Sequence, residues 1–204
     1  MKRFLLLVAL SLFVAIPAAQ AGAQNQGAPV TQAQPVQLRS VQADFLQEKH
    51  LKILARPIIS TGSFTFQAPQ SLRWEYRTPI RSILLMHGGK VRKFVERDGV
   101  LAEDKSMRLD AMQVVLAEIS NWLDGRFTDN AMFTVSFPKK QTILLTPKEP
   151  GLAALISSIE LKLGDQAGLL DKVIIFEGPG ASTSLTFSKR IINQAIPVTL
   201  FTKK

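Results

Sequence analysis

The stretch from Thr61 to Tyr76 is the sequence feature that most constrains how this chain can fold. It contains two segments in which large apolar residues alternate with polar ones, joined by a turn at Pro69. Alternation with a period of two is typical of a strand with one buried and one solvated face. The sequence therefore predicts an antiparallel hairpin. The apolar face of this hairpin carries Phe64, Phe66, Leu72, Trp74 and Tyr76.

The first residues of the chain have the features of a targeting segment. Lys2 and Arg3 precede an apolar run over residues 4–16, and Ala19-Gln20-Ala21 follows as a small-residue cleavage site. The run is shorter than the roughly 20 residues that span a bilayer, so we predict a secretory signal peptide over residues 1–21. Residues 22–34 consist mainly of Gly, Ala, Gln and Pro and are predicted to be a flexible leader. The remaining residues, 35–204, have the length of one domain.

The absence of cysteine and the distribution of charge exclude several classes of function. The chain has no cysteine, which excludes disulfides, zinc-thiolate sites, thiol catalysis and lipidation of a new N-terminal cysteine. The formal net charge is +9, but the basic residues are scattered and do not form a basic helix with interleaved aromatic residues. We therefore expect no nucleic-acid partner. An exported chain without disulfides predicts a location in a bacterial periplasm.

The rest of the chain predicts a mainly β fold with some helix, of the α+β class. Apolar residues at Leu38, Val41 and Phe45 predict a helix over residues 36–51, and a broad apolar stripe predicts a second helix over residues 101–125. Strand patterns without a βαβ rhythm fill the remainder, the last of them at residues 198–200. We expect a strongly curved antiparallel sheet, a closed or half-open barrel, with helices packed on its concave face.

A search for reactive groups favours binding over catalysis. His50 and His87 are the only histidines and do not have metal-ligand spacing, while Glu96 and Asp98 lie beside turn signals. No nucleophile or phosphate-binding motif occurs. We expect no catalytic residue, no metal and no cofactor, so the protein is not predicted to be an enzyme. Two alternatives remain open: a carrier or sensor of a hydrophobic ligand, and an interaction module whose apolar face is an ordinary packed core.

Six short motifs stand out along the chain: Phe45-x-Gln47, the run from Ser60 to Phe64, Ala68-Pro69, the Leu72-Arg73-Trp74-Glu75-Tyr76 segment, the Leu144–Lys148 segment and the ending from Ile192 to Phe201. Together they resemble the LolA family of periplasmic outer-membrane lipoprotein carriers. The resemblance implies a half-open β-barrel covered by a helical lid. It also implies a chaperone that takes an acylated lipoprotein from an inner-membrane ABC-type exporter and passes it to a receptor lipoprotein at the outer membrane. Related domains act as sensors that restrain an anti-sigma factor, or as accessories in polyene or glycolipid export.

The resemblance and the apolar pattern together predict a site for acyl chains of a lipoprotein or related lipid, in a protein that we expect to be monomeric. The predicted cavity residues are Phe45, Phe64, Phe66, Leu72, Trp74 and Tyr76. The predicted lid residues are Met112, Val115, Leu116 and Ile119. One position departs from the family: the best-known carriers have a lid-binding arginine immediately before the hairpin proline, where this chain has Ala68. Either the lid closes differently here, or the protein serves another lipid.

Overall fold

The computed structural model describes residues 38–105, 118, 122, 130–165 and 169–204, all of which belong to one compact unit, residues 33–204. The described part contains eleven strands and two short helices. The first six strands are β1 (Ser40–His50), β2 (Ile58–Gln67), β3 (Ser71–Thr78), β4 (Ser82–His87), β5 (Lys90–Arg97) and β6 (Val100–Glu103). The remaining elements are β7 (Phe133–Lys139), β8 (Thr142–Pro147), α2 (Pro150–Ala153), β9 (Ser158–Leu163), β10 (Leu170–Phe176), β11 (Ser182–Ile192) and α3 (Thr199–Thr202).

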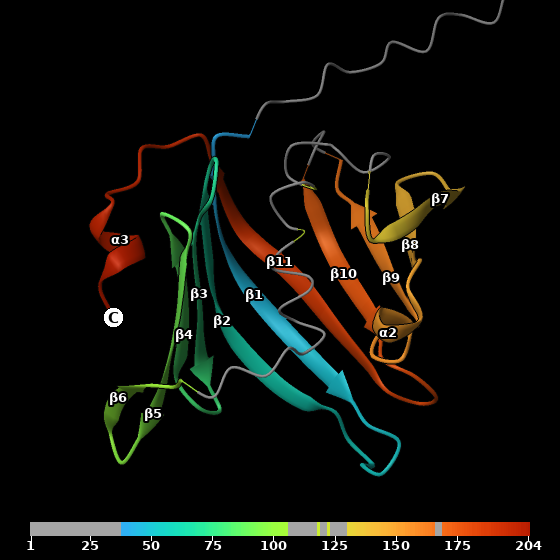
Figure 1. Ribbon diagram of the computed structural model, residues 1–204, viewed down its shortest axis with the longest axis horizontal. Coiled ribbons are helices and arrows are strands. Elements are labelled where there is room, and N and C mark those ends of the chain that lie inside the picture. The colour runs from blue at the N-terminus through green and yellow to red at the C-terminus, as the bar shows by residue number, and fades with distance from the viewer. Residues whose placement is uncertain (1–37, 106–117, 119–121, 123–129, 166–168) are drawn as a thin grey trace, which may run out of the picture. The chain divides into compact units, whose positions relative to one another are not determined.

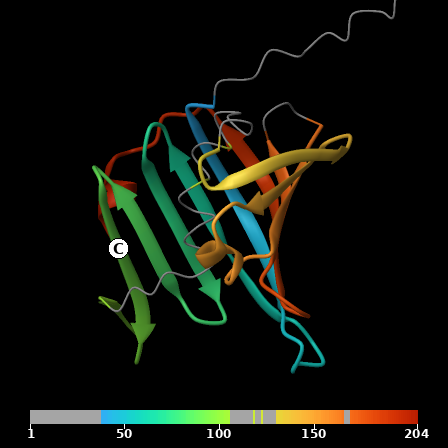
Figure 2. The same cartoon turned by 45° about the vertical axis from the view of Figure 1, so that its right-hand side comes forward.

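All eleven described strands form one sheet in the order β6-β5-β4-β3-β2-β1-β11-β10-β9-β8-β7. Every neighbouring pair is antiparallel, and only the β1–β11 contact joins strands that are not consecutive along the chain. The sheet is open, because β6 and β7 lie at its two edges and do not pair with each other. It bends strongly (Figures 1 and 2), as expected for a twisted sheet of this many strands. The predicted strongly curved antiparallel sheet is confirmed, and it is an open sheet.

The predicted hairpin is formed by β2 and β3. Phe64 pairs with Trp74 and Phe66 pairs with Leu72. Because directly paired residues of antiparallel strands lie on the same face of the sheet, these side chains share one face, as their alternation predicted. All four are buried in the main core.

Each face of the sheet has its own apolar cluster. The main core covers the concave face and draws on β1, β2, β3 and all strands from β7 to β11, together with Trp122. A second, smaller cluster contains Ile83, Leu85 and Phe94, with Leu101 packed against it. Its β4 residues Ile83 and Leu85 lie opposite Glu75 and Arg73 of β3, on the face that points away from the aromatic rings. The second cluster therefore lies on the convex face, on the side where α3 contacts β3 and β4.

The helix predicted over residues 36–51 is wrong, because Ser40–His50 is strand β1 in the middle of the sheet. Val41, Ala43 and Phe45 are buried at every second position, while the residues between them are more exposed. The helical prediction relied on apolar residues at spacings of three and four and gave no weight to Ala43. As a strand, this segment forms backbone hydrogen bonds with β2 on one side and with β11 on the other. A helix in this position would leave the facing backbone groups of β2 and β11 without these partners.

Two other predicted elements need correction. Val100–Glu103 is strand β6, so the second predicted helix cannot begin at residue 101. Thr199–Thr202 is the short helix α3 and not a strand. Glu118 and Trp122 are helical and buried, but the remainder of the predicted lid, residues 106–117, 119–121 and 123–129, lies outside the described residues. A helical lid is therefore not confirmed.

Candidate functional site

The central feature of the concave face is a cluster of aromatic rings from four neighbouring strands. Phe45 of β1 lies 4.7 Å from Trp74 and 5.2 Å from Tyr76, measured between ring centroids. Phe64 of β2 lies 5.3 Å from Trp74, and Phe187 of β11 lies 6.1 Å from Phe64. Several of these pairs are tilted or edge-to-face, which are favourable geometries for aromatic rings. The cluster thus gives this face a continuous apolar surface that offers few directional contacts.

A few polar atoms enter this apolar surface. The Tyr76 hydroxyl donates a hydrogen bond of 2.7 Å to Gln47 Oε1. The indole Nε1 atoms of Trp74 and Trp122 are buried and, among the described residues, have no hydrogen-bond partner. A buried donor without a partner costs about 1–3 kcal/mol. The face therefore contains two N–H groups that a bound acceptor could satisfy.

A β-bulge changes which side chains of β11 reach this face. Asp44 pairs with Ser188, but Gln42 pairs with Ile191, so β11 has one extra residue between these pairs. Lys189 has a positive φ of 50° at this point. A bulge reverses the alternation of the residues that follow it. As a result Ile192 packs against the main core, and Arg190 lies at its margin.

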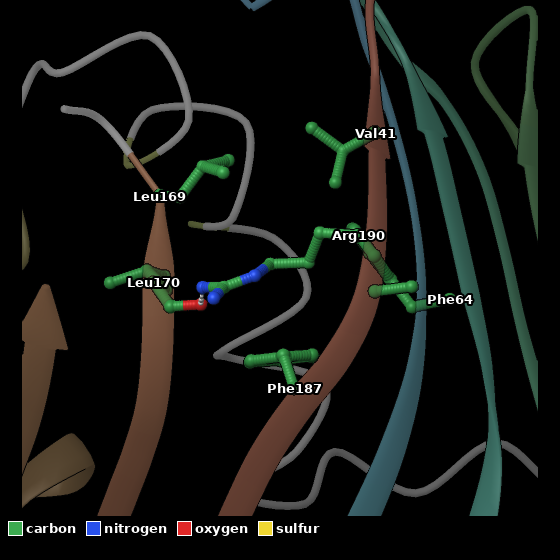
Figure 3. Close-up of a pocket in the computed structure, with 7 residues that line it drawn as sticks. Val41, Phe64, Leu169, Leu170, Phe187 and Arg190 are labelled. Atoms are coloured by element: carbon green, nitrogen blue, oxygen red, sulfur yellow. Dashed lines mark hydrogen bonds between the residues drawn. The ribbon is translucent and has the colours of Figure 1, made fainter. Parts of the chain in front are cut away.

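The bulge lies beside a small apolar cavity between β10 and β11 (Figure 3). The β10–β11 pairing ends at Lys172 and Thr186, and beyond it the two strands separate. Arg190 extends across this separation, and its Nη1 donates to the carbonyl oxygen of Leu170 at 3.1 Å and to the Asp171 carboxylate. The cavity has a volume of about 20 Å³, enough for about one water molecule. Its lining residues are Val41, Ala43, Phe64, Leu169, Leu170, Phe187 and Arg190.

The predicted cavity residues lie together in the main core. Five of the six are buried, and Tyr76 is half-buried at the edge of the same cluster. Whether any of them contacts cargo stays a prediction. The predicted lid residues Met112, Val115, Leu116 and Ile119 all lie outside the described residues. Ala68, where the family resemblance implied an arginine, packs against the main core at the β2–β3 turn.

Some residues of this face were not among the predicted site residues. Phe187 follows the alternation of β11, in which Leu185 is buried, and this pattern could have placed it on the concave face. Val41 and Ala43 were missed because their segment was assigned to a helix. Arg190 gives no sequence signal, since only the bulge brings it to the margin of the cavity.

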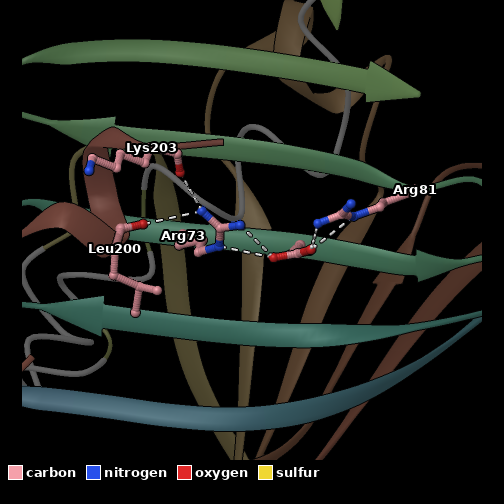
Figure 4. A network of polar contacts seen from close by, with 5 residues as sticks. Arg73, Arg81, Leu200 and Lys203 are labelled. Atoms are coloured by element: carbon pink, nitrogen blue, oxygen red, sulfur yellow. Dashed lines mark hydrogen bonds and ion pairs between the residues drawn. The ribbon is translucent and has the colours of Figure 1, made fainter. Parts of the chain in front are cut away.

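The convex face carries a network of charged groups centred on Arg73 (Figure 4). Its Nη2 lies 2.7 Å from Glu75 Oε2, and its Nη1 donates to the carbonyl oxygens of Leu200 and Lys203 at 3.3 and 2.8 Å. Arg81 Nη2 lies 3.1 Å from Glu75 Oε1. Arg73 thus holds the C-terminal segment against the convex face of the sheet by hydrogen bonds. This position agrees with its predicted orientation away from the rings.

The charge network changes the acidity of Glu75. Partial burial by itself would raise the pKa of this carboxyl, but hydrogen bonds and charge attraction from Arg73 and Arg81 outweigh it. The pKa of Glu75 is therefore held below its ordinary value of 4.5. A carboxyl with a lowered pKa stabilises the fold above its ordinary pKa, and the contribution disappears as the pH falls through the lowered value.

We predict that Glu75→Gln lowers the free energy of unfolding by roughly 1–2 kcal/mol at pH 7, since charged hydrogen bonds of this kind contribute about that amount. The difference from the unmodified protein should shrink as the pH falls below 4.5. Urea unfolding followed by circular dichroism at pH 7 and pH 3 measures both values. Glu149→Gln, at an exposed position, is the control and should change little at either pH. An equal loss at both pH values for Glu75→Gln would contradict an ionic role.

Two other kinds of site were sought in the part of the chain that the structure describes. Within these residues, no group of three or more His, Cys, Asp or Glu side chains is arranged to hold a metal ion. None of the described helices combines the length and the apolar character needed to cross a membrane. His87 makes a 2.8 Å hydrogen bond with Ser71 Oγ and stacks on Phe201. These contacts give His87 a role in packing the C-terminal helix.

The fold and its aromatic face define a class of protein: an open, curved antiparallel sheet with a continuous apolar concave face. The chain belongs to the LolA family, because the family model described as outer membrane lipoprotein carrier protein LolA matches residues 36–204. No curated protein matches the sequence significantly.

Several solved structures are similar at low identity. A DUF1329 family protein from Desulfovibrio piger is 8% identical, with a TM-score of 0.44 over 80% of this chain and 90% of the other. A LolA superfamily protein from Nitrosomonas europaea is 12% identical, with a TM-score of 0.43 over 83% and 92% of the two chains. The Pseudomonas aeruginosa MucA/MucB complex is 14% identical, with a TM-score of 0.39 over 79% and 54%. These scores are low, and the family assignment depends on the family match.

Proposed function

We propose that this protein is a periplasmic carrier that holds the acyl chains of an outer-membrane lipoprotein, or of a related acylated lipid, against its concave face. The observation that carries the proposal is the aromatic cluster of Phe45, Phe64, Trp74, Tyr76 and Phe187 in a member of the LolA family. In this proposal residues 1–21 direct export, residues 22–34 are a leader, and residues 35–204 carry the cargo. An inner-membrane ABC-type exporter and an outer-membrane receptor lipoprotein would load and unload it.

The energetics of transfer explain why such a carrier needs an apolar face. Each buried methylene contributes about 0.8 kcal/mol, so an acyl chain of about 14 methylenes would cost roughly 11 kcal/mol to expose to water. A surface that binds through apolar area, without many directional contacts, can hold such a chain and still release it. The aromatic cluster has this character.

In the proposed mechanism the cargo displaces part of the packed core. Ligand pockets typically have volumes of about 300–1,000 Å³, far more than the cavity of about 20 Å³ beside Arg190. The separation of β10 from β11 is the proposed starting point for opening, because the strand pairing ends there and Arg190 bridges the two strands by a side-chain hydrogen bond to Leu170. The unpartnered indole N–H groups of Trp74 and Trp122 would donate to carbonyl oxygens of the acyl esters.

Uptake of a fluorescent triacylated lipopeptide tests the proposal, with native mass spectrometry of protein recovered from the periplasm as a second measurement. Phe64→Leu alters the concave core, and Phe94→Leu makes the same change in the convex cluster, where Phe94 is equally buried. Both should destabilise the fold by about 1–2 kcal/mol. Only Phe64→Leu should weaken lipopeptide binding, by about tenfold, since one tenfold step corresponds to about 1.4 kcal/mol.

A second candidate is a regulatory module that acts by binding another protein. The burial of the ring-bearing residues in the main core favours it, because a packed apolar face needs no lipid to be stable. Absence of retained lipid together with absence of lipopeptide binding would reject the carrier function and leave this candidate.

A further inference from the structure

The loop between β1 and β2, residues 51–57, together with the first residues of β2 forms an exposed apolar surface that the acyl site does not use. Ile53 is 87% exposed, and Leu54, Ile58 and Ile59 are 44%, 42% and 45% exposed. The amide of Leu54 donates to the carbonyl oxygen of Leu51 at 2.9 Å, which closes a turn. This turn presents Ile53 at its tip, and the loop projects from one end of the sheet (Figure 1).

The charges of this loop are of one sign. Lys52 and Arg56 stand on either side of Ile53 and Leu54, and residues 49–59 contain no carboxylate. Lys49 is held by Glu177 at 3.0 Å. Lys52 and Arg56, in contrast, make no ion pair with any residue that the structure describes. The loop therefore offers two available cations next to exposed aliphatic side chains.

We propose that this loop docks the protein on the surface of a bilayer that contains anionic phospholipids. Aliphatic side chains enter the boundary between headgroups and acyl chains, while flanking lysine and arginine side chains pair with phosphates. A projecting turn of this size exposes little of the roughly 800 Å² per partner that a stable protein interface buries. It is sufficient for weak, reversible membrane attachment, which charge attraction strengthens. The attachment does not depend on the concave face and goes beyond the proposed carrier function.

Vesicle flotation tests the proposal with protein recovered from the periplasm after export. The probes are vesicles of phosphatidylglycerol and phosphatidylethanolamine and vesicles of phosphatidylcholine, each at 50 mM and 500 mM NaCl. Binding is expected on the anionic vesicles at low salt, with a marked loss at high salt, because salt screens the attraction of exposed charges. Little binding is expected on phosphatidylcholine.

Two double variants separate the apolar and the charged contributions. Ile53→Ser with Leu54→Ser should weaken binding at least tenfold. Lys52→Gln with Arg56→Gln should weaken it roughly 25-fold, from about fivefold for each cation near an anionic surface. The matched control is Lys90→Gln with Val91→Ser, which changes an exposed cation and an exposed aliphatic residue at the opposite end of the sheet. This control should bind as the unmodified protein does.

Several results would overturn the proposal. They are absence of binding to anionic vesicles, equal binding to both vesicle types, and unchanged binding by either loop variant. Loss of a concentration-dependent dimer in the Ile53→Ser, Leu54→Ser variant, without a change in vesicle binding, would instead assign the loop to self-association. Loss of a cross-linked protein complex under the same condition would assign it to a protein partner. All variants should bind the acylated lipopeptide normally, so failure of the membrane proposal and failure of the carrier proposal are distinguishable.

Discussion

Gly62→Ala is expected to destabilise the fold by about 3 kcal/mol, near the upper end of the usual cost of overpacking. A Cβ atom at this position would lie 2.0 Å from the carbonyl oxygen of Glu75 and 2.6 Å from the ring of Phe45. Neither neighbour can easily give way, because the carbonyl belongs to the β2–β3 pairing and the ring is packed against Trp74. The free energy of unfolding from urea titration measures the effect.

Gly151→Ala is the matched control for Gly62→Ala. No atom lies within 4 Å of a Cβ at this position, and Gly151 is in the short helix α2. Its substitution should change stability by less than about 0.5 kcal/mol or slightly raise it. If both glycine substitutions had the same small effect, Phe45 could not lie over Gly62, and the aromatic cluster as described would be wrong.

Trp74→Asp is expected to prevent folding. Trp74 is 1% exposed and is surrounded by aromatic rings on the concave face. A charge at this position would therefore not be hydrated. Removing a large buried ring costs about 3–5 kcal/mol, and burying an unpaired carboxylate adds to this loss. The sum reaches the whole stability of a typical domain. Soluble yield and the circular dichroism spectrum measure the outcome.

Ile80→Asp, a substitution to the same residue at an exposed position just after β3, is the control for Trp74→Asp and should fold normally. Normal folding of Trp74→Asp would show that water reaches the concave face. It would therefore favour an open cavity over a packed core. The milder Trp74→Phe keeps an aromatic ring, a smaller one, and removes one unpartnered indole N–H. It should fold, and in the proposed carrier it should weaken the binding of the acyl ester.

Much of the fold could be predicted from short-range pattern. The alternation in β2 and β3 placed Phe64, Phe66 and Trp74 correctly on one face, since side chains of a strand alternate whatever the partner strand is. The same rule predicted Arg73 on the other face, where it binds the C-terminal segment. The pattern failed at β1, because Leu38, Val41 and Phe45 fit a helical spacing as well as a strand. Pairing with two neighbouring strands decided the matter.

The candidate site was less predictable. The ring-bearing residues were identified from sequence, but their burial in one core depends on how strongly the whole sheet bends. Phe187 reaches Phe64 and Trp74 because β11 pairs with β1 across more than 130 residues of chain. The alternation within one strand does not indicate which distant strand will pair with it.

The hairpin from Thr61 to Tyr76 summarises the division between sequence and tertiary structure. The sequence alone determined that the hairpin has one apolar and one polar face, because alternation is a property of each strand. Only the tertiary structure decided that the apolar face is packed, that Gly62 makes room for the ring of Phe45, and that Arg190 reaches the margin of the core. The physical reason is that these features depend on strand register and on one bulge at Lys189, which arise only when distant strands pair.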